Sequence, residues 1–156
     1  MSAEPIDLGD DVARGAVAGV VAAGAMAVEM WLDLAVTGAK TDELRLLGGL
    51  LPGLRRLWPI TGLLMHLGNG AALGAFYGWV QAGLPGKPWQ RGLLLAEVEN
   101  IVLWPVLLLL ARLQPASRGG TAQHFNTPSA FAIEVVRHAV YGVVLGLVFD
   151  RLAPRR

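Results

Sequence analysis

Two histidines, His66 and His138, are the residues of this sequence best suited to binding a haem, because each lies inside a long apolar segment. Residues four apart lie on one helix face, so each histidine begins a ridge almost free of side-chain bulk. Two neutral imidazoles at matched depth could hold the iron of a b-type haem. The two ridges would then have to face each other, or face a shared slot. The glycines of the ridges, which would make room for the flat ring, are Gly70, Gly74, Gly142 and Gly146.

Acidic residues near these histidines suggest a second candidate site, for a smaller metal ion. Carboxylates and imidazoles are common metal ligands, and Glu134 and His138 are four residues apart on one face. However, the Glu-x-x-His spacing of di-iron four-helix proteins does not occur here. Arg137 also needs a carboxylate partner, Glu29 or Glu134, because an unpaired guanidinium in lipid is costly. The candidate metal ligands are Glu29, Asp33, His66, Glu134 and His138.

A simpler interpretation, which we favour, is that the histidines form hydrogen bonds to neighbouring helices and fix their packing. Glycine ridges are also the usual surfaces of close approach between membrane helices. Further along the chain, Glu97, Glu99 and Asn100 form a second polar cluster. Together with Glu29 and Asp33, these acids could line an ion or proton path in an oligomer, which is the third interpretation.

The elements that carry these residues are four apolar segments, each long enough to cross the hydrocarbon core of a membrane. Of the 156 residues, 54% are hydrophobic and only 16% are charged, well below the share of charge in soluble domains. Because lipid offers no partner to open backbone groups, we predict an all-α integral membrane protein with one domain over residues 1–156. The predicted helices cover residues 12–36, 60–82, 89–113 and 129–152.

The first connector, residues 37–59, has the pattern of an amphipathic helix lying at the membrane surface. Its leucines fall near one helical face, its arginines on the opposite one, and Trp58 at its end is typical of a membrane interface. The leucines are Leu44, Leu47, Leu51 and Leu54, and the arginines are Arg45, Arg55 and Arg56.

The sequence repeats itself, which indicates that the four helices form two hairpins. His66, Gly70 and Gly74 recur as His138, Gly142 and Gly146 at an offset of 72 residues. The first and third helices match at an offset of 73, where Gly19, Ala23 and Trp31 align with Gly92, Ala96 and Trp104. Repeat one covers about 12–82 and repeat two about 89–152. Since each repeat crosses the membrane twice, we predict a pseudo-twofold axis along the membrane normal.

Paired His-x-x-x-Gly-x-x-x-Gly helices in a chain with four spans resemble small bacterial membrane protein families of uncharacterised function. The resemblance covers most of the chain and implies the fold, but it implies no activity. Lys and Arg are equally divided between the two faces of the membrane, and the basic tail with Arg155 and Arg156 favours cytoplasmic termini.

The residues that are absent exclude several classes of function. There is no cysteine for a disulfide or thiolate site, and no P-loop, Rossmann, His-Glu-x-x-His or EF-hand motif. A net charge of +1 gives no indication of nucleic-acid binding. We therefore expect a multi-pass protein of the cell membrane that is not an enzyme. Its expected role is that of a structural or accessory subunit, in contact with lipid and with copies of itself or other membrane subunits.

Overall fold

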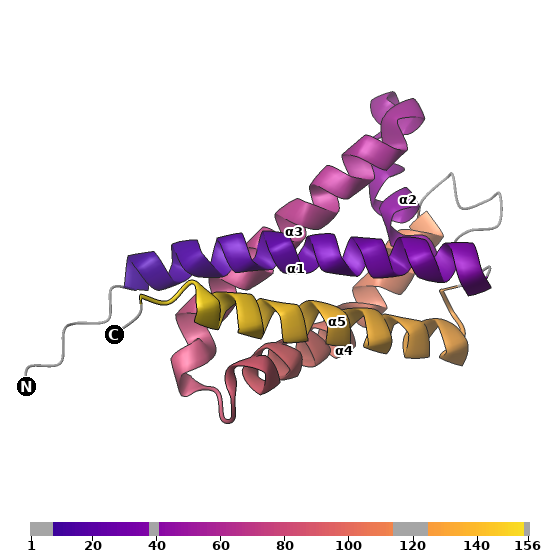
Figure 1. Ribbon diagram of the computed structural model, residues 1–156. Coiled ribbons are helices and arrows are strands. Elements are labelled where there is room, and N and C mark those ends of the chain that lie inside the picture. Colours follow the sequence, from indigo (N-terminus) through magenta and orange to yellow (C-terminus); the bar gives the residue numbers. More distant parts are fainter. Residues whose placement is uncertain (1–7, 38–40, 114–124, 155–156) are drawn as a thin grey trace, which may run out of the picture.

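The computed structural model describes residues 8–37, 41–113 and 125–154, and all regular elements within these ranges are helices (Figure 1). The predicted all-α fold is therefore confirmed, and the four predicted segments correspond to the four long helices. Arg155 and Arg156 lie outside the described residues. The elements are α1 (Leu8–Thr37), α2 (Glu43–Gly48), the 3-10 helix η1 (Pro52–Leu57), α3 (Trp58–Val80), the 3-10 helix η2 (Gln81–Gly83), α4 (Pro88–Leu113) and α5 (Pro128–Arg151).

Three of the long helices, α1, α4 and α5, are long and apolar enough to cross a membrane, whereas α3 is not. The prediction of four spans is thus supported by composition for three helices only. With 23 residues, α3 is long enough, so its composition is the reason. Its glycines, together with His66 and Asn69, lower its mean hydropathy.

Glycines bring α1 and α3 into backbone contact. A methyl group on Gly74 would overlap the carbonyl oxygen of Gly15, and one on Gly19 would overlap that of Gly70. Close approach of this kind is how membrane helices gain dispersion energy without a hydrophobic driving force. The glycine ridge of α3 is therefore a helix-packing surface.

The second pair of helices, α4 and α5, packs in the same way. A methyl group on Gly146 would overlap the carbonyl oxygen of Pro88, and one on Gly92 would overlap that of Gly142. Pro88 and Gly92 follow Gly15 and Gly19 by 73 residues, and Gly142 and Gly146 follow Gly70 and Gly74 by 72. The backbone contacts of the two pairs thus occur at the positions that the sequence repeat aligns.

The two pairs meet at Tyr77 and Phe149, which are themselves 72 residues apart. Their rings form a T-shaped contact with centroids 5.2 Å apart. Tyr77 also donates a hydrogen bond of 3.3 Å to the carbonyl oxygen of Pro88 at the start of α4. Phe149 lies beneath the guanidinium of Arg14, near the start of α1. Each ring therefore contacts the first turns of a helix from the other pair.

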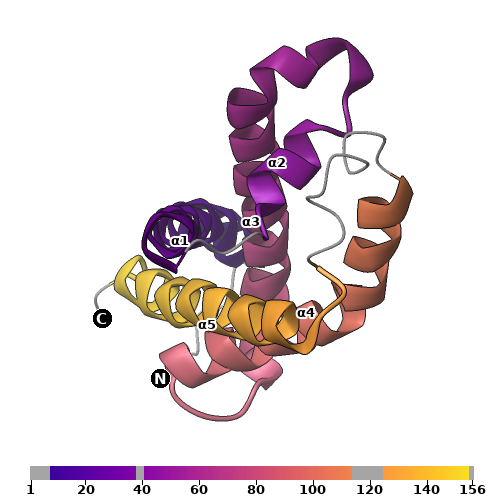
Figure 2. The ribbon, with the colours of Figure 1, turned by 90° about the vertical axis from the view of Figure 1, so that its right-hand side faces the viewer.

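The arrangement differs on the two sides of this contact. α1 and α5 run side by side along their length (Figure 1), whereas α3 and α4 barely touch. Figure 2 shows the C-terminal half of α4 standing apart from α3, with α2 between them. Pro105 lies inside α4, where proline removes a helical hydrogen bond and favours a kink.

The prediction of one amphipathic surface helix in the first connector is wrong, because the segment forms two short helices. α2 packs into the molecule: Leu46 is buried, and a methyl group on Gly62 of α3 would overlap the carbonyl oxygen of Leu44. In and just before η1, by contrast, Leu51, Leu54 and Leu57 are exposed. The side chain of Arg55 lies outside the described part of the chain.

Replacing Gly74 by alanine should destabilise the protein, because the new methyl group has only the backbone of α1 to displace. Overpacking of this kind costs about 1–3 kcal/mol. We expect the same direction for Gly146→Ala in the other pair. The measurement is thermal unfolding of the purified protein in a mild detergent.

The matched control is Gly68→Ala, six residues earlier on α3, where nothing lies within 4 Å of the added carbon. It should leave the unfolding temperature unchanged or raise it. Equal effects of Gly68→Ala and Gly74→Ala would contradict the close approach of α1 and α3.

Candidate functional site

A fully buried arginine, Arg137 on α5, lies at the centre of an ionic cluster. Its Nη1 donates to Glu134 Oε1 at 2.7 Å, and its Nη2 donates to Asp33 Oδ2 at 3.0 Å. Glu29 Oε2 lies 3.8 Å from its Nε. The expected pairing of Arg137 with Glu29 or Glu134 is confirmed, since both approach it and Asp33 joins them.

The cluster connects three parts of the chain. Glu29 and Asp33 belong to α1 and Arg137 belongs to α5, and Nη1 of Arg137 also donates to the carbonyl oxygen of Thr41 at 3.0 Å. Three of the five candidate metal ligands therefore surround a guanidinium. Within the described ranges, no group of three His, Asp or Glu side chains is placed to hold a metal ion. The arrangement does not fit the metal site considered from the sequence.

His138, the residue after Arg137 on α5, lies against Glu99 of α4. Its Nδ1 lies 2.8 Å from the carbonyl oxygen of Glu134, and a carbonyl only accepts, so Nδ1 carries a hydrogen. Its Nε2 lies 3.1 Å from Oε2 of Glu99. The two atoms are within ion-pair distance when the imidazole is protonated, but Oε2 of Glu99 has no hydrogen-bond partner. The interpretation of Glu99 as part of a separate cluster is wrong, because α4 brings it to His138.

His66 is buried on α3, where its Nε2 donates to the carbonyl oxygen of Ala23 on α1 at 3.1 Å. In both histidines Nε2, the usual nitrogen for an axial ligand, thus has a protein partner. Gly70, Gly74, Gly142 and Gly146 face neighbouring helix backbones and leave no shared slot. The hollow between the two histidines measures about 40 Å³. These residues do not fit a haem.

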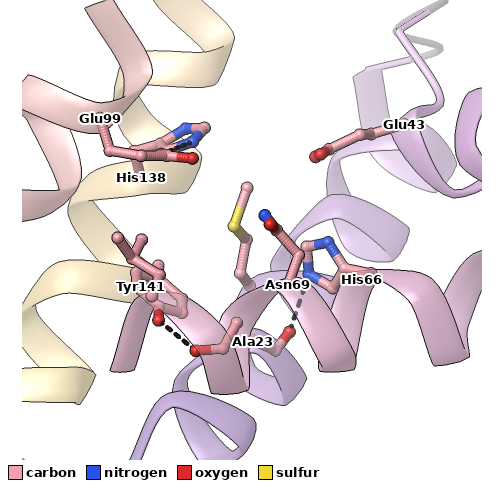
Figure 3. A pocket seen from close by; sticks show the side chains of 10 residues that line it. Ala23, Glu43, His66, Asn69, Glu99, His138 and Tyr141 are labelled. Carbon is pink, nitrogen blue, oxygen red and sulfur yellow. Dashed lines mark hydrogen bonds and ion pairs between the residues drawn. The ribbon is translucent and has the colours of Figure 1, made fainter. Parts of the chain in front are cut away.

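The histidines instead border an open hollow between α3 and α4, which we call the lateral cleft. Its inner part is the hollow of about 40 Å³, and its outer part measures about 170 Å³. Glu43, Asn69, Glu99 and His138 line both parts. Figure 3 shows Glu43 of α2 pointing across the hollow towards His138 and Glu99. Asn69 and His66 of α3 lie on the other side of the hollow from His138.

The outer part of the cleft is apolar along α4. Of its lining residues, Leu103 and Val106 are also exposed on the outer surface of the helix. The cleft therefore opens sideways, at the apolar flank of the molecule. The α4 residues along this wall, apart from Glu99 and Asn100, are Leu103, Trp104, Val106, Leu107 and Leu110.

Several polar atoms at the cleft have no hydrogen-bond partner. These include Oε2 of Glu43 and Nδ2 of Asn100, whose side chain is only 3% exposed. Glu97 lies near Asn100 on α4, and its Oε1 likewise has no partner, but Glu97 does not line the cleft. Burial raises the pKa of the Glu43 carboxyl above its ordinary value, and the nearby His138 acts in the opposite direction.

Sequence reasoning missed Glu43 and Asn69. Asn69 lies one residue before Gly70, so it is next to the ridge that drew attention as a haem slot. Glu43 follows the helix cap Asp42, whose Oδ1 accepts from the backbone nitrogen of Arg45. That capping pattern predicts a helix start, but nothing in it predicts that α2 turns inward.

Replacing Arg137 by glutamine should strongly destabilise the protein, because it leaves the buried Glu134 and its neighbours without a counter-charge. Breaking a buried ion pair from one side costs about 3–5 kcal/mol. Adding Asp33→Asn to this variant should restore part of the loss. Thermal unfolding in detergent measures both effects.

Arg14→Gln is the control, because Arg14 pairs with Asp11 within one turn of α1, in an i,i+3 arrangement that is only partly buried on the Arg14 side. Its cost should stay within about 1 kcal/mol. An Arg137→Gln protein as stable as the Arg14→Gln protein would mean that the cluster does not hold α1 to α5.

Comparison with known proteins adds a family but no activity. No curated protein and no solved structure matches the chain at a significant level. A family model described as a family of unknown function, DUF6789, matches residues 9–156, nearly the whole chain. The chain therefore belongs to the family of unknown function DUF6789.

Proposed function

We propose that this protein is an accessory membrane protein with four spans, which acts by binding a ligand in its lateral cleft. The first step of the proposal is that α3 crosses the membrane with α1, α4 and α5. Of the residues that lower its hydropathy, His66 and the glycine ridge are buried against other helices, whereas Asn69 is exposed and lines the lateral cleft. Its outer surface carries the exposed side chains of Ile60, Leu64, Phe76 and Trp79. Lipid would therefore meet an apolar helix.

The position of the chain ends supports the same step. α1 begins and α5 ends at the same end of the molecule (Figure 1). A chain with three spans would place these ends on opposite sides of a membrane, whereas four spans place them on one side. We propose the cell membrane as the location, with both termini cytoplasmic. The matching glycine contacts of the two helix pairs favour two repeated hairpins.

The main support for a binding function is that some polar atoms lining the cleft have no hydrogen-bond partner. Buried polar atoms are nearly always hydrogen-bonded, so each exception needs an explanation. Oε2 of Glu43 and Nδ2 of Asn100 lack partners, yet both residues line an open hollow. A ligand that supplies these hydrogen bonds explains why the chain tolerates their cost. A purely structural bundle would have no reason to keep them.

The contact between Glu99 and His138 favours a second candidate, proton or cation transport. However, Glu29 and Asp33 are engaged with Arg137, and Glu97 lies outside the cleft lining. The acids do not form one line through the described part of the chain. Binding therefore explains more of the site than conduction does. The glycine ridges are used within the chain, so the proposal does not require self-association through them.

Replacing Asn100 by leucine should stabilise the protein, because it removes the amide nitrogen Nδ2, which has no hydrogen-bond partner at a buried position. Relief of such a group is worth about 1–3 kcal/mol. Gains of this kind are typical of residues kept for function at a cost in stability. Thermal unfolding in detergent, without added ligand, is the measurement.

The comparison variant is Tyr141→Phe, which loses the hydrogen bond of 2.8 Å from the tyrosine hydroxyl to the carbonyl oxygen of Gly70. It should destabilise the protein. If Asn100→Leu also destabilises it by a similar amount, Asn100 is a packing residue and the binding function loses its support.

Single cysteines should reveal four spans, because the chain has no cysteine of its own. Three exposed residues mark the ends of the spans: Arg56 just before α3, Lys87 between α3 and α4, and Arg151 at the end of α5. In intact cells, a membrane-impermeant maleimide should label Arg56→Cys but neither Lys87→Cys nor Arg151→Cys. Labelling of Arg56→Cys and Lys87→Cys from the same side would show that α3 does not cross the membrane.

A further inference from the structure

We propose that the lateral cleft binds an amphiphile with a protonated amine, whose ammonium group lies between Glu43 and Glu99 and whose hydrocarbon chain lies along α4. The inference rests on the binding function proposed above, to which it adds the chemical class of the ligand. Three observations carry it: the charge of the inner cleft, its unpartnered atoms and the apolar wall of its opening.

The inner cleft has an excess of acid. Glu43 forms no ion pair within the described residues, and its Oε2 has no hydrogen-bond partner. Glu99 lies at ion-pair distance from His138, and with a protonated imidazole that pair is neutral as a whole. Arg137 adds no free positive charge, because three carboxylates surround it. A ligand entering from lipid would therefore meet a carboxyl group without a counter-charge, and a cation is the ligand that stabilises its ionised form.

The unpartnered atoms match an amine in their hydrogen bonds as well. An ammonium group has up to three donors and no acceptor, and ionised carboxylates only accept. Bonds between such charged partners are the strong ones. Figure 3 shows the carboxyl groups of Glu43 and Glu99 on opposite sides of one hollow. Nδ2 of Asn100, which has no partner, would donate a hydrogen bond to an oxygen atom of the ligand near its amine.

The opening of the cleft fits a hydrocarbon chain. Trp104, Leu107 and Leu110 line it, and Leu103 extends from it to the exposed flank of α4. A volume of about 170 Å³ is smaller than that of pockets that enclose a whole small ligand, roughly 300 Å³ and above. The cleft therefore holds the headgroup and the first methylene groups, and the rest of the chain lies outside on α4.

Other ligand classes fit less well. An anionic amphiphile would place its charge beside Glu43 and Glu99, and like charges at this distance repel each other. A bare metal ion lacks a ligand set, because no three acidic or imidazole side chains of the described residues converge on one point. A neutral alcohol would bring no charge to stabilise the ionised form of Glu43.

The test is a calorimetric titration of the full-length protein in uncharged maltoside micelles. The probes are decylammonium, decanol and decanoate, which share one chain length and differ in the charge of the headgroup. We expect saturable binding of one decylammonium per chain, and no saturable heat with decanoate. Glu43→Gln should weaken decylammonium binding by at least about tenfold, the effect of losing one charged hydrogen bond.

Two variants make the result specific. Glu97→Gln is the matched control, since it removes a carboxylate from α4 that does not line the cleft, and it should bind decylammonium normally. Leu103→Trp should weaken binding by filling the opening while leaving both carboxylates in place. Thermal unfolding of each variant confirms that it is folded. Equal binding by Glu43→Gln and the unchanged protein, or heat that never saturates, would overturn the proposal.

The failure of the ligand class can be told apart from the failure of the binding function. If decanol or decanoate binds as tightly as decylammonium and Leu103→Trp abolishes that binding, the cleft is a binding site but not one for ammonium. The stability of Asn100→Leu tests the binding function independently of any probe.

Competition distinguishes the two sources of an amine. Lysophosphatidylethanolamine carries the ammonium group on a lipid, and lysophosphatidylglycerol is its counterpart without an amine. Displacement of decylammonium by the first and not by the second assigns the cleft to a lipid headgroup. Displacement by neither assigns it to an amphiphilic amine that is not a phospholipid. Displacement by lysophosphatidylglycerol would overturn the ammonium specificity.

Discussion

The buried guanidinium of Arg137 constrains the rest of the arrangement, because it cannot stay buried without the carboxylates that surround it. Two of these carboxylates, Glu29 and Asp33, come from α1, whereas Arg137 itself lies on α5. The two helices must therefore stay side by side at this depth. The same ionic cluster reaches Thr41 through its backbone, and so it also sets the direction in which the chain enters α2.

The positions of α3 and α4 that the sequence repeat aligns with this ionic cluster carry no charged side chain. At the repeat offsets, Glu29 and Asp33 correspond to Val102 and Val106 of α4, and Arg137 corresponds to Met65 of α3. Glu134 corresponds to Gly62, against which α2 packs instead. Without an ionic cluster, α3 and α4 barely touch there, and α2 packs between them, with Leu46 in one buried cluster with Ala111 of α4. The lateral cleft is thus the counterpart of the closed contact between α1 and α5.

The glycine ridges act at a different place from the cleft and have a different role. They set how closely α1 approaches α3 and how closely α4 approaches α5, and they leave the histidines at the border of the hollow. His66 and His138 are consequently unequal despite their equivalent sequence positions. His66 donates to the backbone of Ala23, and His138 contacts the carboxyl group of Glu99. The two histidines therefore do not form a symmetric site.

The helices could be predicted from the sequence because long apolar runs and local signals such as Thr127 and Pro128 determine them. Thr127 caps α5 through Ala130, as its position before a proline indicates. The pairing of Arg137 could also be predicted, since a guanidinium inside an apolar segment requires a carboxylate. The cleft could not be predicted, because it depends on which helices separate. Glu43 and Glu99 come from α2 and α4, and no local pattern predicts that they share one hollow.

The most direct test of this account is a pair of distances between spin labels in lipid nanodiscs. One double-cysteine variant would label Val28 and Val136 on α1 and α5, and the other would label Leu64 and Ile101 on α3 and α4. The four positions are exposed and correspond at the repeat offsets, so the two pairs differ only in the side of the molecule. We predict a clearly longer distance between Leu64 and Ile101 than between Val28 and Val136. Equal distances would show that α3 and α4 are packed together, and would contradict the existence of the cleft.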